Sequence, residues 1–158
     1  TVSTAGIVPE LSKLLSRRNF VKLAISLNAT TDEQRTKLMP VNRKYPLAGL
    51  LSECRNAPLP NRERITFEYV LLHGVNDSLD DARRLVELLK GIRAKVNLIA
   101  FNEHAGSPFR RPPDESVGAF REFLMSKGIT AIVRQSKGKD ILAACGQLGG
   151  RGKAINNT

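Results

Sequence analysis

The sequence predicts an α/β protein built on a parallel sheet, and two features of its hydrophobic pattern support that prediction. Short apolar, β-branched segments alternate along the chain with segments whose apolar residues recur at the 3.6-residue spacing of a helix. The β segments are nearly continuous apolar runs, which is typical of parallel strands buried on both faces. Repeated alternation of the two element types favours β–α–β crossovers.

Four strands are predicted after an opening stub at residues 3–6. They are Val21–Leu27, Ile65–Leu72, Val96–Phe101 and Ile129–Arg134. The predicted helices are Val8–Leu15, Asp32–Leu38, Leu47–Cys54, Ser78–Lys90 and Glu115–Ser126. The start at Ser78 is the clearest, because its hydroxyl can cap free N–H groups and the acidic pair Asp80-Asp81 suits the positive end of a helix.

Length and composition indicate one globular domain over residues 1–148, followed by a flexible, disordered tail over residues 149–158. No run of about 18 apolar residues occurs, so no membrane partner is expected. A charged start followed by an apolar stretch is also missing, which argues against a signal peptide. We therefore expect a cytoplasmic protein, and we expect it to be a monomer.

The chain is strongly basic, with 25 Lys and Arg against 15 Asp and Glu and a formal net charge of +10. This excess favours nucleic acid or another polyanion as a partner, and the alternative is a merely basic surface. The basic pairs are dispersed, at Arg17-Arg18, Arg43-Lys44, Arg83-Arg84 and Arg110-Arg111. Dispersed pairs suit a broad phosphate-contacting face, whereas 5% aromatic residues argue against a base-stacking platform.

Small polar residues follow one predicted strand after another. They are Ser3-Thr4, Ser26-Leu27-Asn28, His73-Gly74 with Asn76-Asp77, and Asn102. In parallel α/β folds the carboxyl ends of strands line the binding cleft, where hydroxyls and amides can bond a ribose, a carboxylate or an adenine edge. Ordinary loop caps and turns are the alternative interpretation of each residue taken alone.

Cys145 lies in the run DILAACGQL, between small apolar residues and Gly146. A glycine allows the backbone to turn or to approach another group closely, and nearby Lys137 and Lys139 favour the thiolate. A thiolate on such a segment is a plausible nucleophile, and a buried structural cysteine is the alternative.

The segment SKGKDILAACGQL (136–148) resembles the C-terminal signature of the 23S rRNA adenine C2-methyltransferases of the RlmN type, radical-SAM enzymes to which the C8-methylating Cfr enzymes are close relatives. The resemblance runs in unbroken order over residues 1–148. STAGIVPELSKL (3–14), LAISLNATTDEQRTKLMPVNRKYPL (23–47), ITFEYVLLHGVND (65–77) and VNLIAFN (96–102) resemble segments around the third to sixth barrel strands. RPPDESVGAFREFLMSKGITAIVRQSKGKDI (111–141) resembles the closing helix and strand.

The resemblance implies a fold, a reaction and a set of residues. The fold is the C-terminal half of a (β/α)6 partial TIM-type barrel with parallel strands, plus a closing helix and strand. The family methylates C2 of adenine 2503 in 23S rRNA and of adenine 37 in tRNA. Its cofactors are S-adenosylmethionine and a 4Fe-4S cluster, which needs an electron donor. By resemblance, Ser3, Ser26, Leu27, Asn28 and Asn102 contact S-adenosylmethionine, and Cys145 is the cysteine that becomes S-methylated.

Three parts of the family pattern are missing from this sequence. The C-x3-C-x2-C loop that binds the cluster, the G-E-P segment and the second cysteine, which releases the RNA adduct, do not occur, so no metal ligand is assigned here. All three precede the matched region in family members, so we expect this chain to be a fragment and to be inactive alone.

The residues by themselves also allow two other functions. One is a non-catalytic RNA-binding or ribosome-associated module, and the other is an independent cysteine-nucleophile enzyme. Cys54 is predicted to be a core residue, and neither His73 nor His104 has a partner at metal-ligand spacing. Glu68 lies inside a predicted strand, so its carboxylate must be paired or must face a cavity.

Overall fold

The computed structural model describes residues 1–17 and 19–135 of the chain. Within them, five strands form one sheet in which each strand pairs in parallel with its neighbours in chain order. The strands are β1 (Val2–Thr4), β2 (Leu23–Ser26), β3 (Ile65–Leu71), β4 (Ala94–Ala100) and β5 (Thr130–Arg134). The predicted α/β class with parallel strands is confirmed, and this sequential strand order is that of a β/α-barrel segment.

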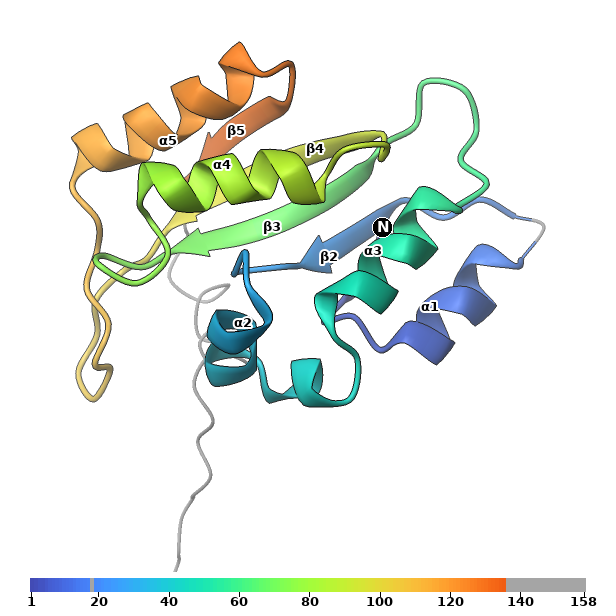
Figure 1. The fold of residues 1–158 in the computed structure, drawn as a ribbon, viewed down its shortest axis with the longest axis horizontal. Helices are drawn as coiled ribbons and strands as arrows, with labels where there is room; N and C mark the ends of the chain where they lie inside the picture. Colours follow the sequence, from blue (N-terminus) through green and yellow to red (C-terminus); the bar gives the residue numbers. More distant parts are fainter. Residues whose placement is uncertain (18, 136–158) are drawn as a thin grey trace, which may run out of the picture.

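Helices connect the successive strands. They are α1 (Val8–Leu15), α2 (Asp32–Leu38), the short 3₁₀ helix η1 (Pro40–Arg43), α3 (Leu47–Arg55), α4 (Leu79–Leu88) and α5 (Asp114–Ser126). The predicted bounds of α1 and α2 agree residue for residue, and those of the other helices differ by one or two residues. Figure 1 shows α4 and α5 lying in front of the strands, and α2 beside the carboxyl end of β2.

The main core lies between the sheet and the helices, and it includes side chains of α1, α3, α4 and α5. Along β3, Ile65, Phe67 and Tyr69 are buried in this core, whereas Thr66 and Glu68 between them are only half-buried. The prediction that both faces of the strands are apolar and buried is therefore wrong for the first half of β3. Side chains alternate across a strand, so in this half of β3 the second face carries polar residues that are only half-buried. The prediction holds near the carboxyl end of β3, where Val70 belongs to a second buried cluster with Leu38 and Met39.

Helix α4 begins as predicted. The Ser78 hydroxyl accepts a hydrogen bond from the Asp81 N–H at 3.1 Å, and the Asp81 carboxylate accepts one from the Ser78 N–H at 3.2 Å. This reciprocal capping box satisfies N–H groups that have no partner inside the helix. The helix is followed by Gly91 with φ +79°, a conformation that favours glycine.

Strand β2 is not an edge of the described sheet, because a shorter strand pairs with its other side. Residues 2–4 form β1, which pairs with β2 through Val2–Leu23, Ser3–Ala24 and Thr4–Ile25. The edges of the described sheet are consequently β1 and β5. Residues 136–158 lie outside the described part, and with them lie Cys145 and the expected tail.

Candidate functional site

The carboxyl ends of all five strands meet at one edge of the sheet, because every strand pair is parallel. The arrowheads of the strands in Figure 1 point toward this edge. It gathers the residues that the sequence singled out after β2 and β4, namely Ser26, Leu27, Asn28 and Asn102. We call it the carboxyl edge.

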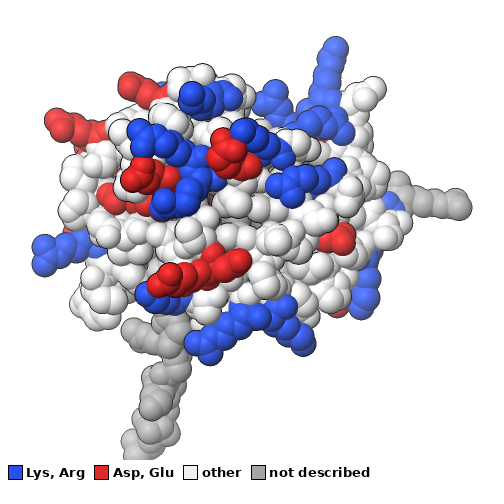
Figure 2. Space-filling model, in the orientation of Figure 1, with Lys and Arg blue, Asp and Glu red and all other residues white. Residues whose placement is uncertain are grey.

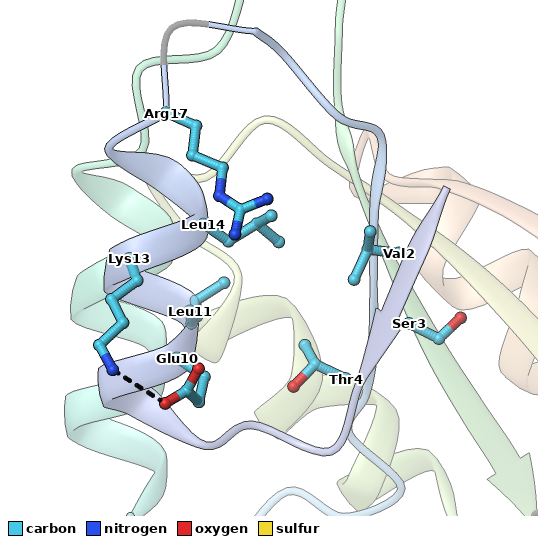
Figure 3. Close-up of a pocket in the computed structure, with 8 residues that line it drawn as sticks. All are labelled: Val2, Ser3, Thr4, Glu10, Leu11, Lys13, Leu14 and Arg17. Carbon is cyan, nitrogen blue, oxygen red and sulfur yellow. Dashed lines mark hydrogen bonds and ion pairs between the residues drawn. The ribbon is translucent and has the colours of Figure 1, made fainter.

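Ser3 and Ser26 lie on the polar face of the sheet, opposite the main core. In Figure 3 the side chains of Val2 and Thr4 point toward α1, and that of Ser3 points the other way. Ser26 alternates with Ile25 and Leu27, which are both fully buried in the core. Ser3 is exposed and Ser26 half-buried, so both hydroxyls can reach a molecule bound on the polar face.

Polar side chains continue across this face at matching register. Ser26 pairs with Glu68, which pairs with Asn97, and Thr66 pairs with Lys95 on the adjoining row. Within residues 1–135, the Glu68 carboxylate makes no hydrogen bond or ion pair. Glu68 is half-buried on this face, and of the two arrangements that the sequence left open, a paired carboxylate is not formed among the described residues.

Leu27 and Asn28 are held firmly by backbone contacts. The Leu27 N–H donates to the Glu68 carbonyl at 2.9 Å, and the Leu27 side chain is fully buried. Asn28 has φ +58°, in the left-handed region that asparagine tolerates better than most residues. Its Oδ1 accepts a hydrogen bond from the Val70 N–H at 2.9 Å, so its side chain joins the end of β2 to the carboxyl-terminal part of β3.

Asn76 is a buried residue whose importance the sequence did not reveal. Its Nδ2 donates to the carbonyls of Asn28 and Val70, both at 2.8 Å, and its Oδ1 accepts from the Leu72 N–H at 2.7 Å. From the sequence, Asn76 was assigned only to the polar turn that follows β3. Its full burial depends on a contact with a residue 48 positions away, which no local pattern encodes.

Arg35 is a second residue that sequence reasoning missed. It lies in α2, whose sequence DEQRTKL looks like an exposed helix, yet the side chain is fully buried. Its guanidinium donates to the carbonyls of Leu27 at 3.1 Å, Ala5 at 2.7 Å and Ser26 at 3.1 Å. Burial lowers the pKa of Arg35 to about 10, and nearby Asp32 partly opposes that shift. The group therefore stays charged at neutral pH.

Asn102 directly follows Phe101 at the carboxyl end of β4 and is half-buried. Its Oδ1 accepts a hydrogen bond from Arg111 Nη1 at 2.9 Å. The structure thus brings Ser26, Leu27, Asn28 and Asn102 to one edge, with Ser3 on the polar face that leads to it.

The chain is similar over nearly its whole length to bacterial RNA-modifying enzymes. It is 59% identical over 155 residues to "Dual-specificity RNA methyltransferase RlmN" of Geobacter sulfurreducens, covering 98% of the chain and 43% of that protein. The protein of the same name from Geotalea uraniireducens is 57% identical, covering 96% of the chain and 44% of that protein. The chain belongs to the RlmN family. It spans less than half the length of these curated relatives.

Solved structures agree with this assignment. A radical SAM methyltransferase from Sphaerobacter thermophilus superposes with a TM-score of 0.83 at 46% identity, over 92% of this chain and 43% of that one. A domain of pyruvate-formate lyase-activating enzyme from Bacteroides vulgatus, at 16% identity and a TM-score of 0.63, is similar in fold alone. A scan against protein-family models found no match.

Three arginines line a hollow beside the carboxyl edge of this RlmN-family chain. The hollow has a volume of about 580 Å³ and lies between α5 and β5. Arg111 follows β4, Arg121 lies on α5 and Arg134 ends β5. The side chain of Asp114, which also lines it, is 92% exposed and pairs with Arg111 at 3.6 Å. Positive charge dominates this hollow.

A second hollow, of about 300 Å³, lies between β1 and α1 (Figure 3). Leu11 and Leu14 form its apolar wall, and Glu10, Lys13 and Arg17 stand at its rim. Glu10 and Lys13 pair with each other at 3.2 Å. The hollow lies on the helix side of β1, so it is separate from the polar face onto which Ser3 points.

The remaining titratable residues do not add chemistry to the site. Cys54 is buried in the core as predicted, and burial raises the pKa of its thiol to about 12. His73 contacts Asp77 at 3.3 Å, and His104 contacts the Ala105 carbonyl at 3.1 Å. The described residues contain no cluster of His, Cys, Asp or Glu that could hold a metal ion, and none of their helices is suited to crossing a membrane.

Proposed function

We propose that this chain is the C-terminal portion of an RNA methyltransferase that modifies C2 of adenine 2503 in 23S rRNA and of adenine 37 in tRNA. The observation that supports it most is the identity of 54–59% to proteins named as dual-specificity RNA methyltransferases. In this proposal Cys145 accepts a methyl group on sulfur before the methyl carbon reaches the base. A thiolate suits this step, because thiolate sulfur is nucleophilic.

The carboxyl edge fits S-adenosylmethionine as a ligand. The hydroxyls of Ser3 and Ser26 and the amide of Asn102 offer hydrogen bonds to a ribose, an amino-acid carboxylate or an adenine edge. The side chain of Asn28 is buried and bonds to Val70 and Met39, so it shapes this segment from within the fold. The buried side chain of Leu27 fixes the backbone between Ser26 and Asn28. When bound, this cofactor supplies the methyl group, and with a reduced cluster it supplies a radical. The residues of this chain orient it and exclude water.

The 4Fe-4S cluster does not fit the residues of this chain. A cluster needs three or four thiolates, the sequence has two cysteines, and one of these is Cys54, a core thiol with a raised pKa. Cluster ligands and the contact with an electron donor are therefore assigned to other parts of the whole protein. We assign to this chain only cofactor positioning, the methyl-accepting sulfur and part of the RNA surface.

RNA contact is proposed at the arginine-lined hollow. A target adenine must reach the carboxyl edge, and the phosphates that flank it must then lie near that edge. Arg111 and Arg134 follow or end strands there, and Arg121 faces them from α5. Figure 2 shows the helix-covered face, where Lys and Arg are interspersed with Asp and Glu. That face lacks the uniform charge of a phosphate-binding surface.

Mass spectrometry of the full-length protein, with its cluster reconstituted, tests the proposal. We expect a methyl group on the Cys145 sulfur and on adenine C2 of an rRNA hairpin. Cys145→Ala should abolish RNA methylation, whereas Cys54→Ala, the matched control in the core, should retain it. A methyl group on C8 would instead indicate the Cfr-type reaction. An unmodified RNA with bound protein would indicate a non-catalytic RNA-binding module and would reject the proposal.

A further inference from the structure

Arg35 is a buried charged residue whose guanidinium, among the described residues, is bonded to neutral oxygens and not to a carboxylate. In the described part of the chain no carboxylate pairs with it directly, and all four of its acceptors are neutral oxygens. Three are main-chain carbonyls at the carboxyl ends of β1 and β2, and the fourth is Asn42 Oδ1 at 3.0 Å. A buried charge without an ionic partner is costly, so hydrogen bonds from the whole guanidinium must offset that cost.

One nitrogen of this group bridges two strands. Arg35 Nη2 donates to the Ala5 carbonyl at 2.7 Å and to the Ser26 carbonyl at 3.1 Å. Strand β1 is only three residues long, so few ladder hydrogen bonds hold it against β2. The guanidinium adds a second connection between the strands, just beyond the point where the ladder ends.

The chain around β1 is shaped to admit this group. Gly6 has φ +100°, and a Cβ added there would lie 3.2 Å from Arg35 Nη2 and 3.0 Å from a Leu50 methyl group. A side chain at position 6 would therefore strain the backbone and displace the guanidinium.

We propose that Arg35 is a positioning residue for the cofactor: by joining the ends of β1 and β2, it sets the distance between Ser3 and the segment Ser26–Asn28. The inference rests on the proposed function, since it takes these residues as contacts of S-adenosylmethionine. Arg35 itself touches only protein groups. Its planar fork reaches several carbonyls at fixed angles, which a lysine ammonium cannot reproduce.

The test compares affinity for S-adenosylmethionine with turnover in the full-length protein. Arg35→Lys should raise the dissociation constant, measured by calorimetry, about ten-fold or more, with a smaller effect on kcat at saturating cofactor. Arg93→Lys is a matched control, because Arg93 also donates to two carbonyls, those of Leu59 and Pro60, but lies just before the amino end of β4. Its affinity should stay within about two-fold of the wild-type value.

A second variant covers the case in which Arg35→Lys does not fold. Gly6→Ala perturbs the guanidinium from outside α2 and should also weaken cofactor binding. Wild-type affinity in a folded Arg35→Lys or Gly6→Ala protein rejects the positioning role, and so does failure of both to fold, which would make Arg35 a folding residue. A wild-type protein that binds no S-adenosylmethionine would reject the proposed function itself.

Discussion

At the scale of single residues, the carboxyl edge is organised by buried polar side chains that hydrogen-bond to the main chain. Asn28, Asn76 and Arg35 are all buried, and each connects backbone groups of segments that are distant in sequence. Backbone carbonyls and N–H groups at strand ends have lost their ladder partners, and burial makes unsatisfied groups costly. These side chains therefore hold the strand ends together at the edge to which the proposed function assigns the cofactor.

Asn76→Ala should destabilise the protein strongly. The change removes three hydrogen bonds and leaves the carbonyls of Asn28 and Val70 and the N–H of Leu72 without them. We expect a loss of about 3 kcal/mol in the free energy of unfolding. Urea denaturation followed by circular dichroism measures it, with Asn97→Ala on the half-exposed polar face as control, expected within about 0.5 kcal/mol of wild type. Equal stability of the two variants would contradict the expectation.

At the scale of elements, local sequence signals predicted most of the helices and strands, and long-range contacts account for what was missed. Helices α1 and α2 were predicted to the residue, because the apolar periodicity of α1 and the polar Thr-Asp start of α2 are local signals. The polar face of the sheet was not predicted, because a local sequence signal does not show which surface of a sheet the helices leave uncovered. Arg35 was missed for a similar reason, since helical spacing does not show that α2 lies against the ends of two strands.

The candidate site was likewise predicted where local signals determine it and missed where long-range contacts do. Polar residues after each strand predicted that Ser26 and Asn102 would meet at one edge, since parallel strands share their carboxyl ends. Which atoms of Asn28 are engaged in the fold could not be predicted, because its left-handed conformation and its bond to Val70 arise from packing. Residue 145 lies outside the described part, so its role stays a prediction.

The start of α4 gives a prediction with a defined pH dependence. Burial alone would raise the pKa of Asp81, but hydrogen bonds from Ser78, Arg84 and Thr30 lower it. A lowered carboxyl pKa stabilises the fold at pH values above the ordinary aspartate value of about 4, and this contribution is lost as the pH falls through the lowered folded-state pKa.

Asp81→Asn should therefore cost about 1–2 kcal/mol of unfolding free energy at pH 7, and the difference from wild type should shrink below about pH 4. Thermal or urea unfolding at several pH values measures this difference. Asp80→Asn is the matched control, because the Asp80 side chain is 70% exposed and, among the residues that the structure describes, pairs with Arg83 alone. A difference that stays constant from pH 7 to about pH 3 would show that the Asp81 charge is not what stabilises the cap.

At the scale of the whole molecule, the distribution of charge separates two surfaces. On the helix-covered face, Arg83, Arg84 and Lys90 form ion pairs with acidic residues of the same helix or its end. Beside the carboxyl edge, Arg134 is exposed and makes no ion pair within the described residues. Arg134 therefore offers a positive charge without an ionic partner in the described part, at the end of a strand and beside the edge of the proposed chemistry.

Arg134→Ala should weaken RNA binding by the full-length protein and reduce its dependence on salt. Each cation that contacts a phosphate releases a counterion on binding, so the slope of log affinity against log salt should fall in magnitude by about 1. Fluorescence anisotropy with a 23S rRNA hairpin containing the target adenine, over a range of salt concentrations, measures that slope. Arg83→Ala is the control, since Arg83 is an exposed arginine of α4 that is paired with Asp80, and it should leave the slope unchanged. If both variants keep the wild-type slope, RNA phosphates do not contact the arginine-lined hollow, and the RNA surface must be sought elsewhere on the protein.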